Sequence, residues 1–189
     1  MRKQGRFFII SGPSGSGKTT LYKRLLEEFK SLAKTVSVTT RQKRPGEKHS
    51  RDYFFVTPKM FAFKRKQDHF LEWEKVFDNY YGTPKTQVQA LLRKGKDVLL
   101  CIDVKGAETV CRKFPQAVKI SIKTPSFSVL KKRLADRKSE ARMSLALRLK
   151  VAREELRQAK TFDYIVVNGH LETAYQKLRS IVHKELHKK

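Results

Sequence analysis

The sequence has few acidic residues, only two cysteines and no long apolar run. Asp and Glu total 18 of 189 residues against 43 Lys and Arg, so the formal net charge is +25. Cys101 and Cys111 form no CxxC pair, which argues against a structural zinc site and favours two reduced thiols. No apolar stretch approaches the roughly 20 residues of a membrane span. The apolar residues at 7–10 are fewer than the about 7–15 of a signal-peptide core. We therefore expect a cytoplasmic protein without a membrane partner.

The positive charge is spread along the chain rather than gathered in one arm. Its densest part, residues 126–160, holds 11 basic and 4 acidic residues. An excess of this size favours polyanions, which include nucleic acids and phosphorylated small molecules. No basic tail or nucleic-acid motif accompanies it, so we expect no specific nucleic-acid partner. Hydrophobic residues make up 39% of the chain, enough for one domain with a buried core.

Strands and helices alternate through most of the chain. Apolar runs predict strands at 7–10, 97–104, 118–122 and 163–168, and helical spacing predicts helices at 19–29, 107–114, 126–137, 144–160 and 171–186. This alternation predicts an α/β fold with a doubly wound parallel sheet and flanking helices.

Residues 36–85 interrupt the alternation and predict an inserted lobe rich in strands. The expected elements there are strands at 35–40, 53–56 and 70–76, a helix at 59–68 and a turn-rich loop at 79–84. We expect Tyr80 and Trp73 to pack in the interior and Glu74 to be a surface acid.

The segment after the first strand contains the complete pattern G-x-x-x-x-G-K-[ST]. Its glycines let backbone N–H groups wrap phosphate oxygens, and the following helix adds its positive N-terminal end. Lys18 is expected to reach the β- and γ-phosphates, and the Thr19 hydroxyl to hold Mg²⁺. The predicted sheet is therefore of the P-loop NTPase type. The candidate ATP-binding residues here are Gly12, Pro13, Ser14, Gly15, Ser16, Gly17, Lys18, Thr19 and Thr20.

Several other motifs resemble those of the guanylate kinase family, over residues from about 5 to 181. They are Val38-Thr39-Thr40-Arg41 with Arg44-Pro45-Gly46-Glu47, Asp52-Tyr53-Phe54-Phe55, Leu71-Glu72-Trp73, Asn79-Tyr80-Tyr81-Gly82-Thr83, and Ile102-Asp103-Val104 with Gly106. The resemblance implies Mg²⁺-dependent transfer of a phosphoryl group from ATP to GMP, giving ADP and GDP in purine nucleotide metabolism. It also implies one domain in three parts: a core (1–35, 86–135 and 149–189), a GMP-binding lobe (about 36–85) and a lid (about 136–148).

The residue chemistry of the lobe agrees with a nucleoside monophosphate as acceptor. Arg41 and Arg44 lie three apart in a polar loop, where two guanidiniums can clamp a dianionic phosphate. Tyr53 and Tyr81 are expected to complete this phosphate site with neutral hydroxyl donors.

A carboxylate can accept from both N1–H and the N2 amino group of guanine, whereas adenine lacks the N1–H and would leave it unpaired. By the resemblance, Glu72 is the guanine-reading acid and Asp103 a second acceptor. Ser37 and Thr83 match the family's hydroxyls near the base.

Phosphoryl transfer requires positioning and stabilisation of charge on the moving group more than covalent chemistry. By the resemblance, Arg137 and Arg148 supply lid cations and Asn168 lies on the adenine side of ATP. Cys101 stands where the family usually carries an acid, which removes a carboxylate near Lys18.

Three other functions fit the sequence less well. A non-catalytic guanylate-kinase-like binding module would typically lose the phosphate loop or the clamping arginines, and this chain keeps both. A kinase for a phosphorylated sugar would have no use for Glu72 and Ser37 as base readers. A nucleic-acid binder is suggested by charge alone.

Overall fold

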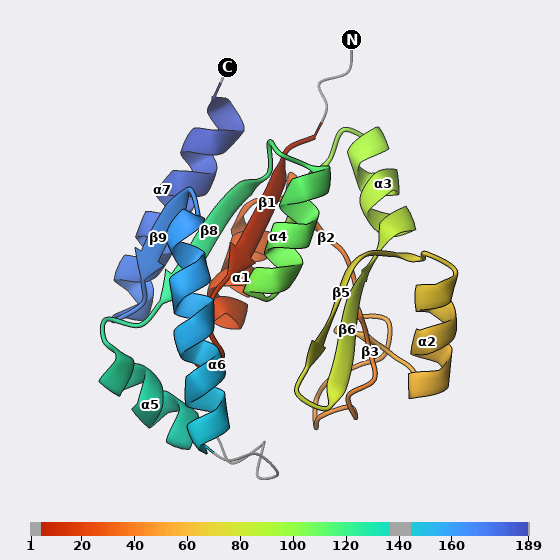
Figure 1. Ribbon diagram of the computed structural model, residues 1–189. Helices are drawn as coiled ribbons and strands as arrows, with labels where there is room; N and C mark the ends of the chain where they lie inside the picture. Colours follow the sequence, from red (N-terminus) through yellow and green to blue (C-terminus); the bar gives the residue numbers. More distant parts are fainter. Residues whose placement is uncertain (1–4, 137–144, 189) are drawn as a thin grey trace.

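A five-stranded, all-parallel sheet forms the centre of the molecule, in a computed structural model that describes residues 5–136 and 145–188 (Figure 1). The strand order is β2-β7-β1-β8-β9. The strands are β1 (Phe7–Ser11), β2 (Leu32–Lys34), β7 (Asp97–Cys101), β8 (Val118–Lys123) and β9 (Tyr164–Val167). Parallel pairing throughout confirms the predicted α/β class.

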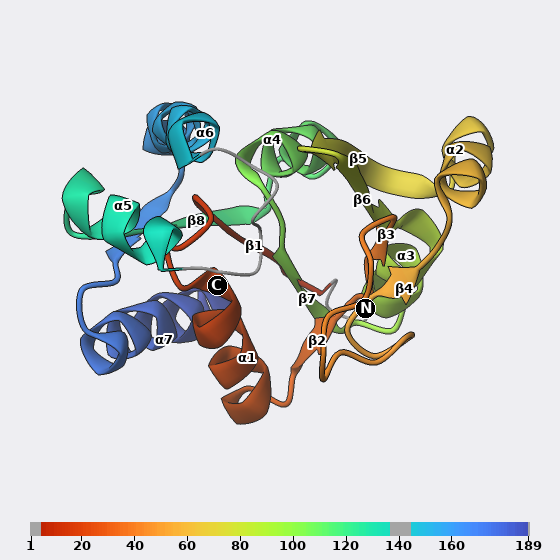
Figure 2. The same ribbon diagram turned by 90° about the horizontal axis from the view of Figure 1, so that it is seen from below.

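Helices cover both faces of this sheet, as Figure 2 shows. One face carries α1 (Lys18–Glu28) and α7 (Leu171–His187), and the other carries α3 (Lys85–Arg93), α4 (Val104–Lys113) and α6 (Leu145–Gln158). Each face has its own hydrophobic core: the first core lies under α1 and α7, and the second core lies under α3 and α4. Along β1, Phe8 and Ile10 pack into the first core, and Phe7 and Ile9 pack into the second, because successive side chains of a strand point to opposite faces. The helix α5 (Phe127–Ala135) packs on α6, and η2 (Ala159–Thr161) follows α6.

A second, mixed sheet of order β4-β3-β6-β5 lies beside the first. Its strands are β3 (Val38–Thr39), β4 (Phe54–Phe55), β5 (Phe70–Val76) and β6 (Asn79–Pro84), and α2 (Pro58–Lys66) covers it. The Phe61 ring of α2 stacks on Phe70 and Tyr80, with centroids 4.6 and 5.3 Å away. The expected packing role of Tyr80 is thus confirmed.

Trp73 is not a core residue, and that expectation is wrong. Its side chain is 39% exposed, with the Arg65 guanidinium 4.8 Å from the ring centroid. Strand alternation explains the difference. The neighbouring Glu72 takes the buried position, so Trp73 points to the opposite face of β5.

Three secondary-structure predictions differ from the structure. Residues 79–84 form strand β6 rather than a loop, because pairing with β3 on one side and β5 on the other outweighs the turn preference of Asn79 and Gly82. Helix α3 was not predicted, although Val88, Leu91 and Leu92 have helical spacing and pack into the second core. Of the strand expected at 35–40, only Val38–Thr39 (β3) is extended into a sheet, and the preceding β2 (Leu32–Lys34) was not expected.

Candidate active site

A cavity of about 280 Å³ opens beyond the carboxyl ends of β1 and β7 and is lined by the central sheet, the second sheet and α6. The carboxyl edge of a parallel sheet is where ligands bind in such folds. Thirteen of the candidate residues line this one cavity: Pro13, Ser14, Gly15, Gly17, Lys18, Thr19, Thr20, Ser37, Tyr53, Glu72, Tyr81, Asp103 and Arg148. Residues from four separate parts of the sequence therefore share a single site.

The remaining candidates lie around that cavity rather than in its lining. Gly12 and Ser16 are buried within the loop after β1, and Thr83 is buried behind Glu72. Asn168 is buried against the loop. Arg41 and Arg44 belong to the loop between β3 and β4, and Arg137 lies outside the described residues.

The loop after β1 has a backbone that only glycine adopts easily. Gly12 has φ 135°, and a Cβ there would lie 2.1 Å from the Ile122 carbonyl oxygen. Gly17, in the left-handed region, caps α1, and a Cβ there would lie 2.2 Å from Nδ2 of Asn168. These close approaches fix the loop against β8 and the end of β9, so its N–H groups form a preorganised anion site.

Lys18 begins α1, and its ammonium donates to the carbonyl oxygens of Gly12 and Pro13, the latter at 3.1 Å. Asn168 reaches the same loop from the other side, where Nδ2 donates to the Ser16 carbonyl at 2.8 Å. Asn168 therefore braces the phosphate loop, and its predicted contact with adenine stays a prediction.

Glu72 is a carboxyl group buried at 5% exposure that accepts a hydrogen bond from the Thr83 hydroxyl. Burial raises its pKa to about 7, with the nearby Asp103 charge adding to the effect. Asp103 caps α4, accepting from Gly106 N–H at 2.7 Å, and burial also raises the pKa of its carboxyl. A Cβ at Gly106 would lie 2.7 Å from Oε2 of Glu72, so glycine leaves this carboxylate its place beside the cavity.

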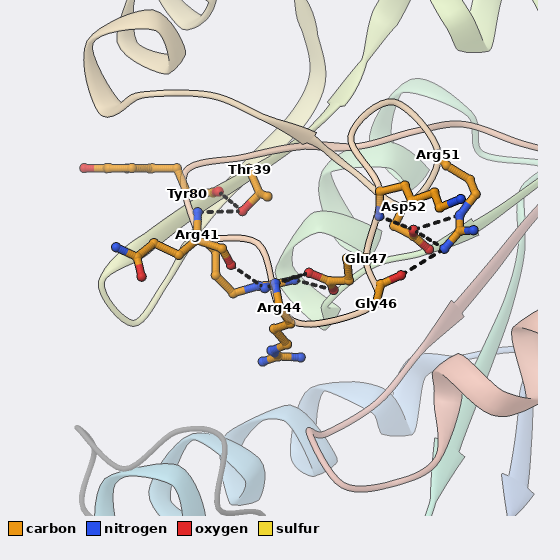
Figure 3. Close-up of polar contacts among 10 residues, drawn as sticks. Thr39, Arg41, Arg44, Gly46, Glu47, Arg51, Asp52 and Tyr80 are labelled. Atoms are coloured by element: carbon orange, nitrogen blue, oxygen red, sulfur yellow. Dashed lines mark hydrogen bonds and ion pairs between the residues drawn. The ribbon is translucent and has the colours of Figure 1, made fainter.

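Glu47 orders the arginine loop, and the sequence analysis assigned it no role (Figure 3). It forms a two-point ion pair with Arg41, at 2.8 and 3.1 Å, and also accepts from the Arg44 backbone N–H at 2.8 Å. The Arg41 guanidinium lies 5.5 Å from the Tyr53 ring centroid. Burial raises the Tyr53 pKa to about 12, so its hydroxyl remains a neutral donor. The sequence feature that could have indicated this role is the position of Glu47 directly after a Pro-Gly turn that follows the two arginines.

Helix α6 presents Arg148, Val151 and Glu155 to the cavity. Arg148 is buried at 6% exposure, and Nη1 donates to the Leu134 carbonyl at the end of α5, 3.0 Å away. Glu155 is a second cavity residue that the sequence analysis did not single out. Its spacing of seven from Arg148 is the signal that could have found it, since residues seven apart share a helix face.

No group of three or more His, Cys, Asp or Glu side chains arranged to hold a metal ion occurs among residues 5–136 and 145–188. In the same ranges, no helix is both long and apolar enough to cross a membrane.

Comparison with known proteins places these features in one family. The guanylate kinase family model matches residues 4–185. Curated guanylate kinases of Chlamydia muridarum and Caldanaerobacter subterraneus are 47% and 43% identical to the chain, covering 97% and 96% of it and 89% and 88% of their own lengths. The crystal structure of guanylate kinase from Anaplasma phagocytophilum aligns with a TM-score of 0.82 at 30% identity, covering all of this chain and 90% of that one.

Proposed function

The chain belongs to the guanylate kinase family, and on that premise we propose that it transfers the γ-phosphoryl group of ATP to GMP in the cavity described above. The observation that carries the proposal is that one cavity is lined by both the phosphate loop and the buried carboxyl of Glu72. A donor triphosphate on the loop and a guanine at Glu72 would then share a single site. The products are ADP and GDP, and the expected place of action is the cytoplasm.

The loop after β1 binds the phosphoryl donor, ATP. Its N–H groups and the N-terminus of α1 attract the phosphates, and Lys18 supplies a mobile cation at the β- and γ-oxygens. Asn168 keeps the loop in shape through the Ser16 carbonyl.

The second sheet and the loop between β3 and β4 bind the phosphoryl acceptor, GMP. Glu72, in its ionised form, accepts from guanine N1–H and N2–H, with Thr83 fixing its orientation. The GMP phosphate is held by Arg41, Arg44, Tyr53 and Tyr81, and Ser37 and Asp103 contact the base side.

Mg²⁺ fits this donor set, because the ion is ordinarily held by few protein oxygens together with substrate phosphates and waters. The Thr19 hydroxyl lines the cavity beside Lys18, and the Asp103 carboxylate lies in the same cavity. Thr19 would hold the ion, whose charge would offset that of the β- and γ-phosphate oxygens. Arg148 would stabilise the charge on the transferring group. The assistance of Arg137, and the division into core, GMP-binding lobe and lid, stay predictions.

The proposed reaction is tested by incubating the protein with ATP, GMP and Mg²⁺ and quantifying all four nucleotides by chromatography. We expect ADP and GDP to form in equal amounts, and both to disappear when the metal is chelated. A sugar phosphate offered in place of GMP should give no ADP above background. ADP formation without GDP would contradict the proposal.

Glu47→Gln is expected to raise the KM for GMP about tenfold and to change kcat less than about twofold. The amide lacks the negative charge that holds the Arg41 guanidinium. The Arg41 side chain must therefore be ordered when GMP binds, and this costs binding free energy. Steady-state kinetics at saturating ATP measure both constants.

Asp52→Asn is the matched control, because Asp52 pairs with Arg51 in the same loop without touching Arg41. An equal rise in KM for both variants would mean that general loop order, rather than the Arg41 clamp, is responsible.

A further inference from the structure

We propose that Glu155 is a positioning residue for the phosphoryl transfer, which sets the Lys18 ammonium toward the donor phosphates from across the cavity. This inference rests on the proposed function and assigns a role to a carboxylate that the mechanism above does not use.

Helix α6 separates its charged residues into two sets. Lys150, Arg153, Glu154 and Arg157 are exposed. Arg148, Val151 and Glu155 instead line the cavity, at spacings of three and four residues that keep them on one face. Glu155 is therefore not a solvated helix charge. A carboxylate on the inward face carries a desolvation cost that an outward position would avoid, which indicates a purpose inside the cavity.

Three carboxyl groups line the cavity, and two of them are already held. Glu72 accepts from Thr83, and Asp103 accepts from the Gly106 N–H. Within the described part of the chain, the Glu155 carboxyl accepts no hydrogen bond, and the cation acting on it most strongly is Lys18. Glu155 is thus the cavity carboxyl with no hydrogen bond of its own that can act on the lysine of the phosphate loop, together with Asp103.

The last residue of β7 gives Lys18 no anionic partner. Cys101 ends that strand within the cavity, and burial raises the pKa of its thiol, so it stays neutral. Asp103, two residues on, caps α4 through one carboxylate oxygen and is also attracted by the Lys18 charge. Glu155 lines the same cavity from α6, while the Lys18 ammonium donates to the Gly12 and Pro13 carbonyl oxygens of the loop.

The position of Glu155 on α6 also couples the placement of Lys18 to that of Arg148. Arg148 lies two turns before Glu155 on the same helix, so a helix position that orients Lys18 simultaneously fixes where the Arg148 guanidinium enters the cavity. Misplacement of a catalytic group by about 1 Å can cost about 100-fold in rate. A rigid helix bearing both side chains limits such misplacement.

The proposal gives kcat a distinct pH dependence. Burial raises the pKa of Glu155 to about 7; the Asp103 charge adds to the rise and the Lys18 charge opposes it. The other ionisable groups lining the cavity are Arg148 on the same helix and Glu72, Tyr53, Tyr81 and Cys101 from the elements opposite. Above pH 7 the carboxylate is ionised and attracts Lys18. Below it the carboxyl is neutral and the attraction is lost, so kcat falls.

The test compares Glu155→Gln and Glu155→Asp with Glu154→Gln, an exposed neighbour whose carboxylate contacts Arg157 and Gln158 on the surface. At pH 8 we expect Glu155→Gln to lower kcat about tenfold, with the KM for GMP within about twofold of wild type. Its kcat should also lose the decline between pH 8 and 6 that wild type shows. Glu155→Asp should keep that decline, and Glu154→Gln should match wild type throughout.

Melting temperatures of all the variants verify folding before their kinetics are compared. Wild-type kcat in Glu155→Gln, or a decline with falling pH equal to that of wild type, would overturn the inference. So would an equal loss of kcat in Glu154→Gln. Absence of GMP phosphorylation in the wild type would instead overturn the proposed function, so the two failures are distinguishable.

Discussion

Replacing Lys18 with alanine is expected to lower kcat/KM for GMP phosphorylation by at least about 10³-fold. The ammonium is the cation that the phosphate loop itself brings to the β- and γ-phosphates, and the negative charge that develops there in the transition state has no substitute within the loop. The fold should persist, because a cation in the first turn of α1 opposes the helix dipole and its removal costs little stability.

Lys23→Ala is the matched control for this variant. Lys23 is an exposed lysine of the same helix and lies away from the cavity. Its kinetics should stay within about twofold of wild type, and both variants should melt within a few degrees of it. A Lys18→Ala protein that is folded and retains a tenth of wild-type turnover would contradict the assigned role.

Glu72→Gln is expected to reduce kcat/KM for GMP about 10³-fold while leaving the KM for ATP unchanged. Hydrogen bonds to a charged acceptor contribute about 1.5–3 kcal/mol each, and the amide replaces the two bonds to guanine by at most one weaker bond. The amide N–H₂ would also face the N2 amino group of the base, donor against donor. The loss should therefore be confined to the guanine side of the reaction.

The pH dependence of GMP binding gives an independent measure of the same residue. Glu72 must be ionised to accept from N1–H and N2–H, and its pKa is about 7. The KM for GMP should consequently rise as pH falls through 7, and this rise should vanish in Glu72→Gln. Glu74→Gln, on the same strand but outside the cavity lining, should keep the wild-type profile. A KM for GMP that is independent of pH in wild type would contradict base reading by a buried carboxylate.

The phosphate loop and the parallel sheet were predictable because their signals are local. Eight contiguous residues define the loop, and its place between an apolar run and an amphipathic helix follows from sequence order alone. The apolar runs at 97–104 and 118–122 likewise carry enough β-branched and aliphatic residues to predict buried strands. Strand β6 was missed because Asn79, Gly82 and Pro84 favour turns, and only pairing with two neighbouring strands makes them extended.

The supporting residues of the site were harder to predict because each acts through a tertiary contact. Glu47 looks like any acid in a polar loop until the chain brings it onto Arg41. Gly106 is an unremarkable helix glycine until Glu72, 34 residues earlier in the sequence, lies against it. Glu155 differs from its exposed neighbour Glu154 only in the helix face that it occupies, and that face is set by the packing of α6 over the sheet edge.

Selection of guanine by a buried carboxylate, for phosphoryl transfer from ATP, can be measured as kcat/KM with GMP, IMP and AMP. IMP keeps N1–H but lacks the N2 amino group, and AMP has neither donor in place. We expect kcat/KM to decrease in the order GMP, IMP, AMP, with the value for AMP at least about 10³-fold below that for GMP. An AMP value within about tenfold of the GMP value would contradict this selection.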